Sequence, residues 1–490
     1  ALAKGLAASP GAAVGKVYFT ADDAVNADDR GEQVILVRNE TSPEDVHGMM
    51  VSQGILTARG GLVSHAAVVA RGWGTPAIVG ADAVKIDGKS FHVGDVVVKE
   101  GDVISIDGTT GEVMLGAMTL AAAEPPAEFH TILKWSDAVR KGKLGVRANA
   151  DTGEDATNAR ELGAEGIGLC RTEHMFLAPD RLPVVRRMIL ASTPAEEEAA
   201  LAELGRVQQI DFEEILLAMD GLPVTVRLLD PPLHEFLPSA EELRIKKATT
   251  GLSKIEAAEL KAAEEWAEHN PMIGTRGVRL GVVRPGLYAM QVRALMAAAA
   301  ALRKKGKNPI VEVMIPLTVT REEMHLARSW VQTEIDRAVK GLKNKPHVTI
   351  GTMIETPRAA IRADEIAEEA DFFSFGTNDL TQLTFGFSRD DVESKMMPAY
   401  LEQGLLKRNP FETVDVGGVG ELVKMGAQRG RSVKKGLKLG VCGEHGGDPE
   451  SIALFYDAGL DYVSCSPFRV PIARLASAQA VIGGSKAETK

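Results

Sequence analysis

From residue 143 onward, short apolar runs alternate with segments of helical periodicity. The apolar runs lie at 144–148, 166–170, 224–229, 310–315, 348–354, 372–375, 439–442 and 462–465. Eight strands with intervening helices in about 350 residues predict a (β/α)8 TIM barrel. A ninth run, 271–274, is weaker and is expected to be a loop. Periodicity alone also allows an open, doubly wound sheet.

The ends of these runs favour the barrel. Nearly every run is followed by a charged or reactive side chain: Arg171 and Glu173, Arg227 and Asp230, Glu355, Asn378 and Asp379, Cys442 and Glu444. Barrel active sites lie at the carboxyl ends of the strands, so five such ends in one chain indicate a shared site. Two long Glu/Ala-rich helical patterns, 196–219 and 239–268, are predicted to be helical insertions.

The chain before the barrel has a different pattern. Within 1–115, β candidates occur at 34–37, 54–57, 77–79, 96–98, 103–106 and 112–115, and helices are expected near Pro43 and Ser64. This predicts a small α/β domain. The Pro/Ala/Glu-rich stretch 121–128 indicates a linker over 116–140, which leaves 141–490 for the barrel. The alternative is that 116–140 forms a loop within one larger domain.

Composition and charge argue against several classes of protein. The chain has 490 residues, 45% hydrophobic and 25% charged, with a net charge of −11, which argues against a nucleic-acid-binding surface. No apolar run reaches the ~18 residues of a membrane span, and no secretory signal is visible at the start. Three cysteines without zinc spacing fit a reducing compartment, and we expect a cytoplasmic protein.

The stretch 54–71 carries the first candidate chemistry. A turn at Gly60-Gly61 leads to Ser64, a good N-cap, so His65 is expected in the first turn of a helix. Unpaired N–H groups and the helix dipole favour an anion there, and Arg59 can add positive charge. Imidazole is a usable nucleophile at neutral pH, so His65 is a candidate phosphoryl carrier. The alternative is an ordinary surface histidine.

The strand ends supply the second set of candidates. Glu355 and Asp379 are carboxylates on neighbouring strand ends, which suit Mg²⁺ as a ligand pair, although both residues could instead cap helices. Three arginines would present planar guanidinium groups to phosphate and carboxylate oxygens, although any one could be structural: Arg171, Arg227 and Arg276. The segment 376–379 adds backbone N–H groups and an amide. Cys442, taken alone, is expected to be a small buried hydrophobe.

These strings resemble a known family. The stretch 54–71 resembles the phosphohistidine domain of enzymes that make or use phosphoenolpyruvate (PEP), namely pyruvate phosphate dikinase, PEP synthase and enzyme I. The segments 168–174, 354–360 and 375–382 are similar to motifs of the same superfamily. The strings at 227–238 and 442–449 look like pyruvate phosphate dikinase in particular. The resemblance covers essentially the whole chain.

The resemblance implies roles for individual residues. His65 would carry the phosphoryl group on a swivelling domain, and Cys442 would protonate the enolate methylene. Glu355 and Asp379 would ligate Mg²⁺. Contacts to PEP or pyruvate would come from Arg171, Arg227, Glu355, Gly376, Thr377, Asn378 and Asp379. One departure is Val63, where the family usually has threonine, so control through that residue is in doubt.

The implied function is phosphoryl transfer between phosphohistidine and pyruvate, and the implied assembly is a homodimer through the barrel. The nucleotide-binding domain of the family has no counterpart in this sequence, which starts without methionine. We therefore expect loading by PEP and not by ATP. Competing interpretations are an enzyme I-like phosphotransferase and a non-catalytic PEP-binding paralogue. A metal-dependent aldolase would explain Glu355 and Asp379 but not the first domain.

Overall fold

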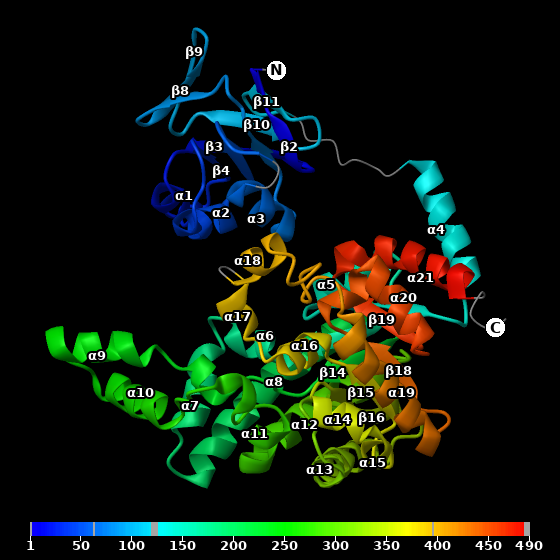
Figure 1. The fold of residues 1–490 in the computed structure, drawn as a ribbon. Coiled ribbons are helices and arrows are strands. Elements are labelled where there is room, and N and C mark those ends of the chain that lie inside the picture. The colour runs from blue at the N-terminus through cyan, green and yellow to red at the C-terminus, as the bar shows by residue number, and fades with distance from the viewer. Residues whose placement is uncertain (1, 62–63, 119–125, 394–395, 485–490) are drawn as a thin grey trace. The chain divides into compact units, whose positions relative to one another are not determined.

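The chain folds as two compact units, Ala1–Pro125 and Pro126–Lys490. The structure is a computed structural model, and it describes residues 2–61, 64–118, 126–393 and 396–484 (Figure 1). Val63, where the sequence departs from the family, lies outside these residues.

The first unit contains an eight-stranded mixed sheet in the order β1-β11-β10-β3-β4-β5-β6-β2. A separate three-stranded sheet, β7-β8-β9, is formed by the chain between β6 and β10. The strands are β1 (Ala3–Lys4), β2 (Leu6–Ser9), β3 (Ala12–Tyr18), β4 (Val34–Arg38), β5 (Gly54–Thr57), β6 (Ala77–Val79), β7 (Lys85–Asp87), β8 (Ser90–Val93), β9 (Val96–Lys99), β10 (Val103–Asp107) and β11 (Glu112–Leu115). Strands β3 to β6 run parallel. The helices are α1 (Ala21–Asp28), α2 (Val46–Val51) and α3 (His65–Trp73).

Strand β4 shows why this unit needs continuous apolar runs. Val34 and Leu36 belong to one core cluster, which includes buried residues of α1, α2 and α3. Ile35 and Val37 belong to a second cluster, which includes Phe91 and residues of β10. A central strand that is covered on both faces has no polar alternation, which explains the run at 34–37.

The second unit is a closed barrel of eight parallel strands, β12 to β19, and the open-sheet alternative is wrong. The strands are β12 (Gly145–Asn149), β13 (Ile167–Arg171), β14 (Pro223–Arg227), β15 (Ile310–Ile315), β16 (His347–Ile354), β17 (Phe372–Phe375), β18 (Lys438–Val441) and β19 (Tyr462–Cys465). The weak run at 271–274 is a 3₁₀ turn, η3 (Pro271–Ile273), and not a strand.

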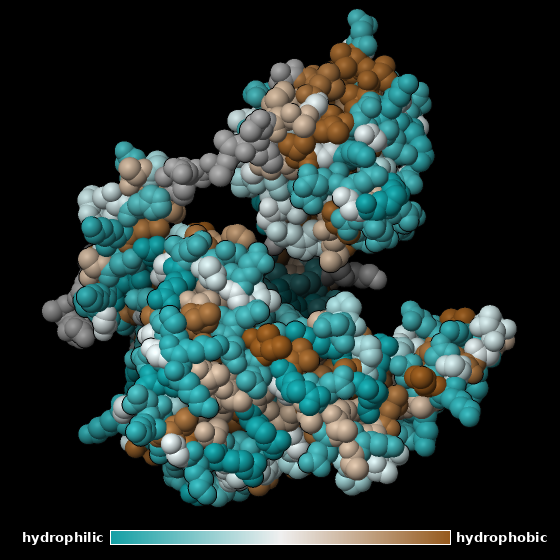
Figure 2. Space-filling view, turned by 180° about the vertical axis from the view of Figure 1, so that it is seen from behind, coloured by the Kyte–Doolittle hydropathy of each residue, from teal (hydrophilic) through white to brown (hydrophobic). Residues whose placement is uncertain are grey.

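Helices separate the strands of the barrel along the chain. They are α4 (Ala127–Arg140), α5 (Gly153–Glu161), α6 (Thr172–Leu177), α7 (Leu182–Leu190), α8 (Pro194–Ala218), α9 (Ala240–Thr249), α10 (Lys254–Glu265), α11 (Val278–Val283), α12 (Pro285–Lys304), α13 (Arg321–Val339), α14 (Pro357–Ile361), α15 (Ala363–Ala367), α16 (Thr377–Phe385), α17 (Arg389–Val392), α18 (Met396–Glu402), α19 (Glu421–Val433), α20 (Pro449–Asp457) and α21 (Val470–Gly484). None of the helices in the described part of the chain has the length and hydropathy to cross a bilayer. Figure 2 shows hydrophilic residues over much of the barrel's surface in that view.

Two helical predictions need correction. The pattern at 196–219 is not an insertion, because α8 packs against α5, α7 and α12 and lies between β13 and β14 in the chain. The pattern at 239–268 is interrupted at Gly251, where φ is +82°, and forms α9 and α10, which project from the barrel in Figure 1.

The predicted linker over 116–140 is also too long. Residues 127–140 form α4, which packs against α21 and belongs to the barrel unit. Its buried Arg140 bonds to Asp137 and Glu165, and Arg474 of α21 pairs with Asp137 at 2.5 Å. The boundary between the units follows Pro125, and residues 119–125 lie outside the described part.

The inside of the barrel is layered. At the amino-terminal end, Glu312 of β15 accepts from Arg147 of β12 (2.6 Å), Thr225 of β14 (2.7 Å) and Lys438 of β18 (2.6 Å). Above this charged layer lies a separate apolar cluster of Leu169, Met314, Met353, Phe372 and Cys442. Cys442, just beyond the end of β18, therefore packs in this apolar cluster inside the barrel.

Replacing Glu312 by glutamine should destabilise the barrel by about 3–5 kcal/mol, because it leaves the buried Arg147 without its counter-charge. Burial raises the Glu312 pKa, but Arg147 and Lys438 outweigh burial and bring it down from 4.5 to about 2. Its stabilising contribution is therefore present above pH 4.5 and lost as the pH falls toward 2. Unfolding midpoints across that range should show this loss in the wild type only.

A matched control for Glu312→Gln is Glu368→Gln. Glu368 pairs with Arg321 at 2.8 Å, but both side chains are about half exposed, so the change should cost less than about 1 kcal/mol. Equal losses in the two variants would contradict the structural role assigned to Glu312.

Candidate active site

An open cavity of about 810 Å³ lies at the carboxyl ends of the barrel strands. Its walls include most of the barrel residues that the sequence singles out: Arg171, Arg227, Arg276, Gly376, Asn378, Asp379 and Cys442. Glu355 and Thr377 do not line it, because both are fully buried. The barrel thus gathers residues that are up to 271 positions apart, from Arg171 to Cys442, around one space.

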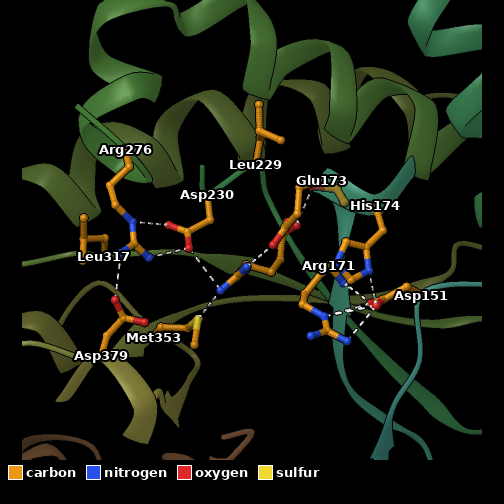
Figure 3. Close-up of polar contacts among 12 residues, drawn as sticks. Asp151, Arg171, Glu173, His174, Leu229, Asp230, Arg276, Leu317, Met353 and Asp379 are labelled. Carbon is orange, nitrogen blue, oxygen red and sulfur yellow. Dashed lines mark hydrogen bonds and ion pairs between the residues drawn. The ribbon is translucent and has the colours of Figure 1, made fainter. Parts of the chain in front are cut away.

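Arg171, at the end of β13, is held by a buried aspartate. Asp151 accepts from the Arg171 backbone N–H at 2.7 Å and pairs with its guanidinium at 2.8 Å. The same carboxylate meets His174 Nδ1 at 2.7 Å, so three polar groups converge in Figure 3. Burial alone would raise the Asp151 pKa, but hydrogen bonds and charge from His174 and Arg171 outweigh burial and bring the pKa below its usual value. The carboxylate therefore stays charged. Arg171 is therefore fixed in place before any substrate binds.

The other two arginines share Asp230. Arg227 pairs with Asp230 at 3.2 Å and also bonds to Glu173, while Arg276 pairs with Asp230 at 2.6 Å. Burial opposes the charge on Asp230, but Arg227 and Arg276 bring its pKa below the usual value. Arg276 also reaches Asp379 at 2.8 Å, as Figure 3 shows. Both guanidinium groups are buried, and these carboxylates hold them in a fixed orientation.

Glu355 lies beside this network and lacks a full set of partners. Its Oε1 accepts from the Leu317 N–H at 2.7 Å, and Leu317 takes a left-handed φ of 58°. Its Oε2 is buried without a hydrogen-bond donor in the described part of the chain. Burial, then Asp379 and Asp230, raise the Glu355 pKa to about 8.

Gly376 allows this arrangement. A Cβ at Gly376 would lie 2.7 Å from Glu355 Oε2, so any side chain there would displace the carboxylate. Glu355 Oε2 thus lies beside other carboxylates without a donor of its own, and Arg276 and Arg227 lower the Glu355 pKa less than burial, Asp379 and Asp230 raise it. A hard divalent cation with oxygen ligands fits that arrangement. Within the described residues, no group of three or more His, Cys, Asp or Glu converges as a metal site, so water and substrate oxygens would complete the shell.

Cys442 lies 2% exposed at the bottom of the cavity. Its backbone carbonyl accepts from Asn149 Nδ2 at 3.0 Å, and Ser464 donates to Asn149 Oδ1 at 2.6 Å, which fixes the loop. Burial raises the Cys442 pKa to about 11. The thiol therefore holds its proton at neutral pH. Cys170 and Cys465 are buried in the main barrel core.

His65 belongs to the first unit. It is the first residue of α3, and Gly60 has a φ of +104° in the turn before it. Ser64 occupies the N-cap position, but its hydroxyl caps no backbone N–H, which corrects that prediction. Thr41 Oγ1 lies 2.9 Å from His65 Nδ1. This contact occupies Nδ1.

Several residues at the site escaped the sequence argument. Asp151 lies two positions beyond the end of β12, where the rule that strand ends carry polar groups could have found it. Asn149 ends the same strand. Arg389 also lines the cavity, from α17, but it lies far from any apolar run and carries no local signal.

Comparison with known families agrees with this geometry. Residues 126–482 match the model of the PEP-utilising enzyme, PEP-binding domain, and residues 31–111 match that of the PEP-utilising enzyme, mobile domain. The chain belongs to the family of PEP-utilising enzymes.

Similar individual proteins include several pyruvate, phosphate dikinases. The chain is 53% identical to pyruvate, phosphate dikinase 1, chloroplastic, of Arabidopsis thaliana, over 98% of this chain and 50% of that protein. It is 53% identical to pyruvate, phosphate dikinase 2 of Zea mays (98% and 55%) and 51% identical to pyruvate, phosphate dikinase of Rhizobium meliloti (99% and 54%). The chain thus spans about half the length of these relatives.

Proposed function

We propose that this chain performs the pyruvate half-reaction of pyruvate phosphate dikinase. A phosphoryl group would pass between His65 Nε2 and the enolate oxygen of pyruvate, giving PEP, or in reverse. The observation that carries the proposal is the group of three oriented arginines beside Asp379 and Glu355, whose Oε2 has no donor in the described part of the chain. These groups match the charges of PEP, which has a carboxylate and a phosphoryl group.

The arginines would bind the anionic groups of the substrate. Guanidinium forks pair with carboxylate and phosphate oxygens in two-point contacts, and Arg171, Arg227 and Arg276 are already held by aspartates and Glu173. Their orientation is set by folding, so the bound state gains charge stabilisation without reorganisation. Asn378 lines the cavity beyond the end of β17 and would add a donor, whereas the Gly376 N–H already donates to the Ile354 carbonyl at 3.0 Å.

Glu355 and Asp379 would hold Mg²⁺. When bound, Mg²⁺ supplies positive charge that stabilises the enolate and phosphoryl oxygens. Arg276 pairs with Asp379 at 2.8 Å and also with Asp230 at 2.6 Å, so it would keep one carboxylate partner if Asp379 held Mg²⁺.

Cys442 would act as the general acid that protonates the enolate. In the PEP-consuming direction, the bond between phosphorus and the enolate oxygen breaks and a bond from phosphorus to His65 Nε2 forms. The methylene carbon of the enolate then takes the proton of the Cys442 thiol, and the thiolate recovers a proton from solvent. A pKa of about 11 keeps this thiol protonated at neutral pH, as a general acid requires.

Isotope exchange tests the proposal directly. Carbon-labelled pyruvate, unlabelled PEP and Mg²⁺ should give labelled PEP without any nucleotide, because the exchange needs only this half-reaction. His65→Asn should give none. An enzyme I-like phosphotransferase would exchange as well but would also pass its phosphate to a carrier protein, and the dikinase relatives favour the first interpretation. A non-catalytic PEP-binding paralogue predicts no exchange in the wild type, and that result would reject the proposal.

Cys442→Ala should abolish the exchange of pyruvate methyl protons with solvent, because no other group is proposed to hold that proton. Alanine keeps most of the packing in the apolar layer, so the fold should survive. Proton NMR of pyruvate in deuterated buffer gives the rate. Cys170→Ala, which removes a thiol from the main core, is the control and should exchange like the wild type. Undiminished exchange in Cys442→Ala would return Cys442 to a purely structural role.

A further inference from the structure

Arg389 is an arginine that lines the cavity and has no role in the proposed mechanism. It begins α17 in the chain segment between β17 and β18. Its backbone N–H donates to Gln382 Oε1 of α16 at 2.9 Å, and its guanidinium carbon lies 5.5 Å from the centre of the Phe411 ring. These contacts anchor the residue from two sides.

The guanidinium of Arg389 joins separate parts of the site. Nη1 donates to Asn378 Oδ1 at 3.1 Å, and Nη2 donates to Glu444 Oε2 at 3.0 Å. Nε lies 3.2 Å from Glu393 Oε1, one turn further along the chain. Asn378 is the neighbour of Asp379, and Glu444 follows Cys442 by two residues. One side chain therefore bridges the start of α16 and the loop that carries the thiol.

The chemistry of the guanidinium fixes the orientation of the Asn378 amide. Arginine has five N–H donors and no acceptor, so the amide atom that faces it must be the oxygen. The Nδ2 end of Asn378 is then the donor end left for another partner. Asn378 lines the cavity, where the oxygens of an enolate or a phosphoryl group would be acceptors.

We propose that Arg389 is a positioning residue, which holds the Asn378 amide with Nδ2 toward the substrate oxygens and ties it to the Cys442 loop through Glu444. Arg389 acts through Asn378 and need not touch the reacting atoms. The inference rests on the proposed function, because Asn378 matters only if the cavity binds PEP or pyruvate.

The test uses pyruvate–PEP isotope exchange by the full chain. Arg389→Met keeps the aliphatic stem but loses every donor, and it should lower the exchange rate at saturating substrate on the order of 10²-fold, because a misplaced group costs about that much. The KM for PEP should change much less, since the three arginines that bind its charges remain. Arg389→Lys keeps the charge without the fork, and it should also be slow because one ammonium cannot hold Asn378 and Glu444 together.

Glu393→Gln is the matched control. It weakens the contact to Nε but leaves the bonds from Arg389 to Asn378 and Glu444, so exchange should stay near the wild-type rate. Loss of activity in this variant equal to that in Arg389→Met would mean that α17 as a whole, and not the Asn378 contact, matters, and would overturn the proposal.

A double-mutant cycle separates positioning from general destabilisation. If Arg389 acts through Asn378, the double variant Arg389→Met/Asn378→Ala should be no slower than Asn378→Ala alone. If the two substitutions instead lower the exchange rate independently, so that their rate factors multiply in the double variant, the proposal is overturned. Wild-type exchange rates in both Arg389→Met and Arg389→Lys would also overturn it. Absence of exchange in the wild-type chain is a different outcome, because it rejects the proposed function itself.

Discussion

PEP labelled in its phosphoryl group is expected, with Mg²⁺, to leave acid-labile and base-stable phosphate on the wild-type chain and none on the His65→Asn variant. His65 starts α3, where free N–H groups favour an anion, and Thr41 occupies its Nδ1 at 2.9 Å. The remaining nitrogen, Nε2, would be the nucleophile in the proposed reaction. Asparagine has a similar polarity but no nitrogen lone pair that can accept a phosphoryl group.

The matched control for this labelling is His47→Asn. His47 lies in the same unit, half exposed, and its Nε2 meets Asp22 at 2.9 Å. It should carry no label, so its replacement should leave the labelling unchanged. Equal label on His65→Asn and wild type would show that the carrier residue is wrongly assigned, whatever the exchange assay gives.

Glu355→Gln and Asp379→Asn should each weaken Mg²⁺ binding and lower pyruvate–PEP exchange by roughly 10²- to 10³-fold or more, because each removes charge from the group that holds the enolate's counter-ion. Both substitutions keep the side-chain size. Glu355→Gln should keep or gain stability, since it removes a buried carboxyl group whose Oε2 has no donor in the described chain. Isothermal titration with Mg²⁺ and thermal unfolding measure the two effects separately.

Glu421→Gln serves as the control for the carboxylate pair. Glu421 pairs with Lys424 at 3.1 Å on an exposed face of α19, so neither Mg²⁺ binding nor exchange should change. Full exchange by Glu355→Gln or by Asp379→Asn would remove that residue from the proposed metal site.

The barrel was predictable because its strands are buried on both faces. Such strands read as unbroken apolar runs, and the predicted runs at 310–315, 372–375 and 462–465 match β15, β17 and β19 at both ends. Strands β7 and β8 were missed since they carry exposed polar residues and are short. Helix α8 was taken for an insertion because its Glu/Ala-rich sequence hides how Leu204 and Phe212 pack into the barrel core.

The candidate site was predictable only in part, for a physical reason. Strand ends mark which side chains reach the cavity, and this rule found Arg171, Asp379 and Cys442. The sequence does not give depth of burial, which raises the pKa of Cys442 to about 11. Nor does it give partners that meet only in the fold, such as Arg389 on Asn378.

The two units enclose separate apolar cores, one set around β4 and the other around the barrel. A chain divided after Pro125 should therefore yield two fragments that fold independently. Phosphoryl transfer would then change from an intramolecular step to a second-order reaction between fragments. Its rate would rise with fragment concentration, and the concentration at which it equals the rate of the intact chain would measure the effective molarity that covalent connection gives His65 at the barrel.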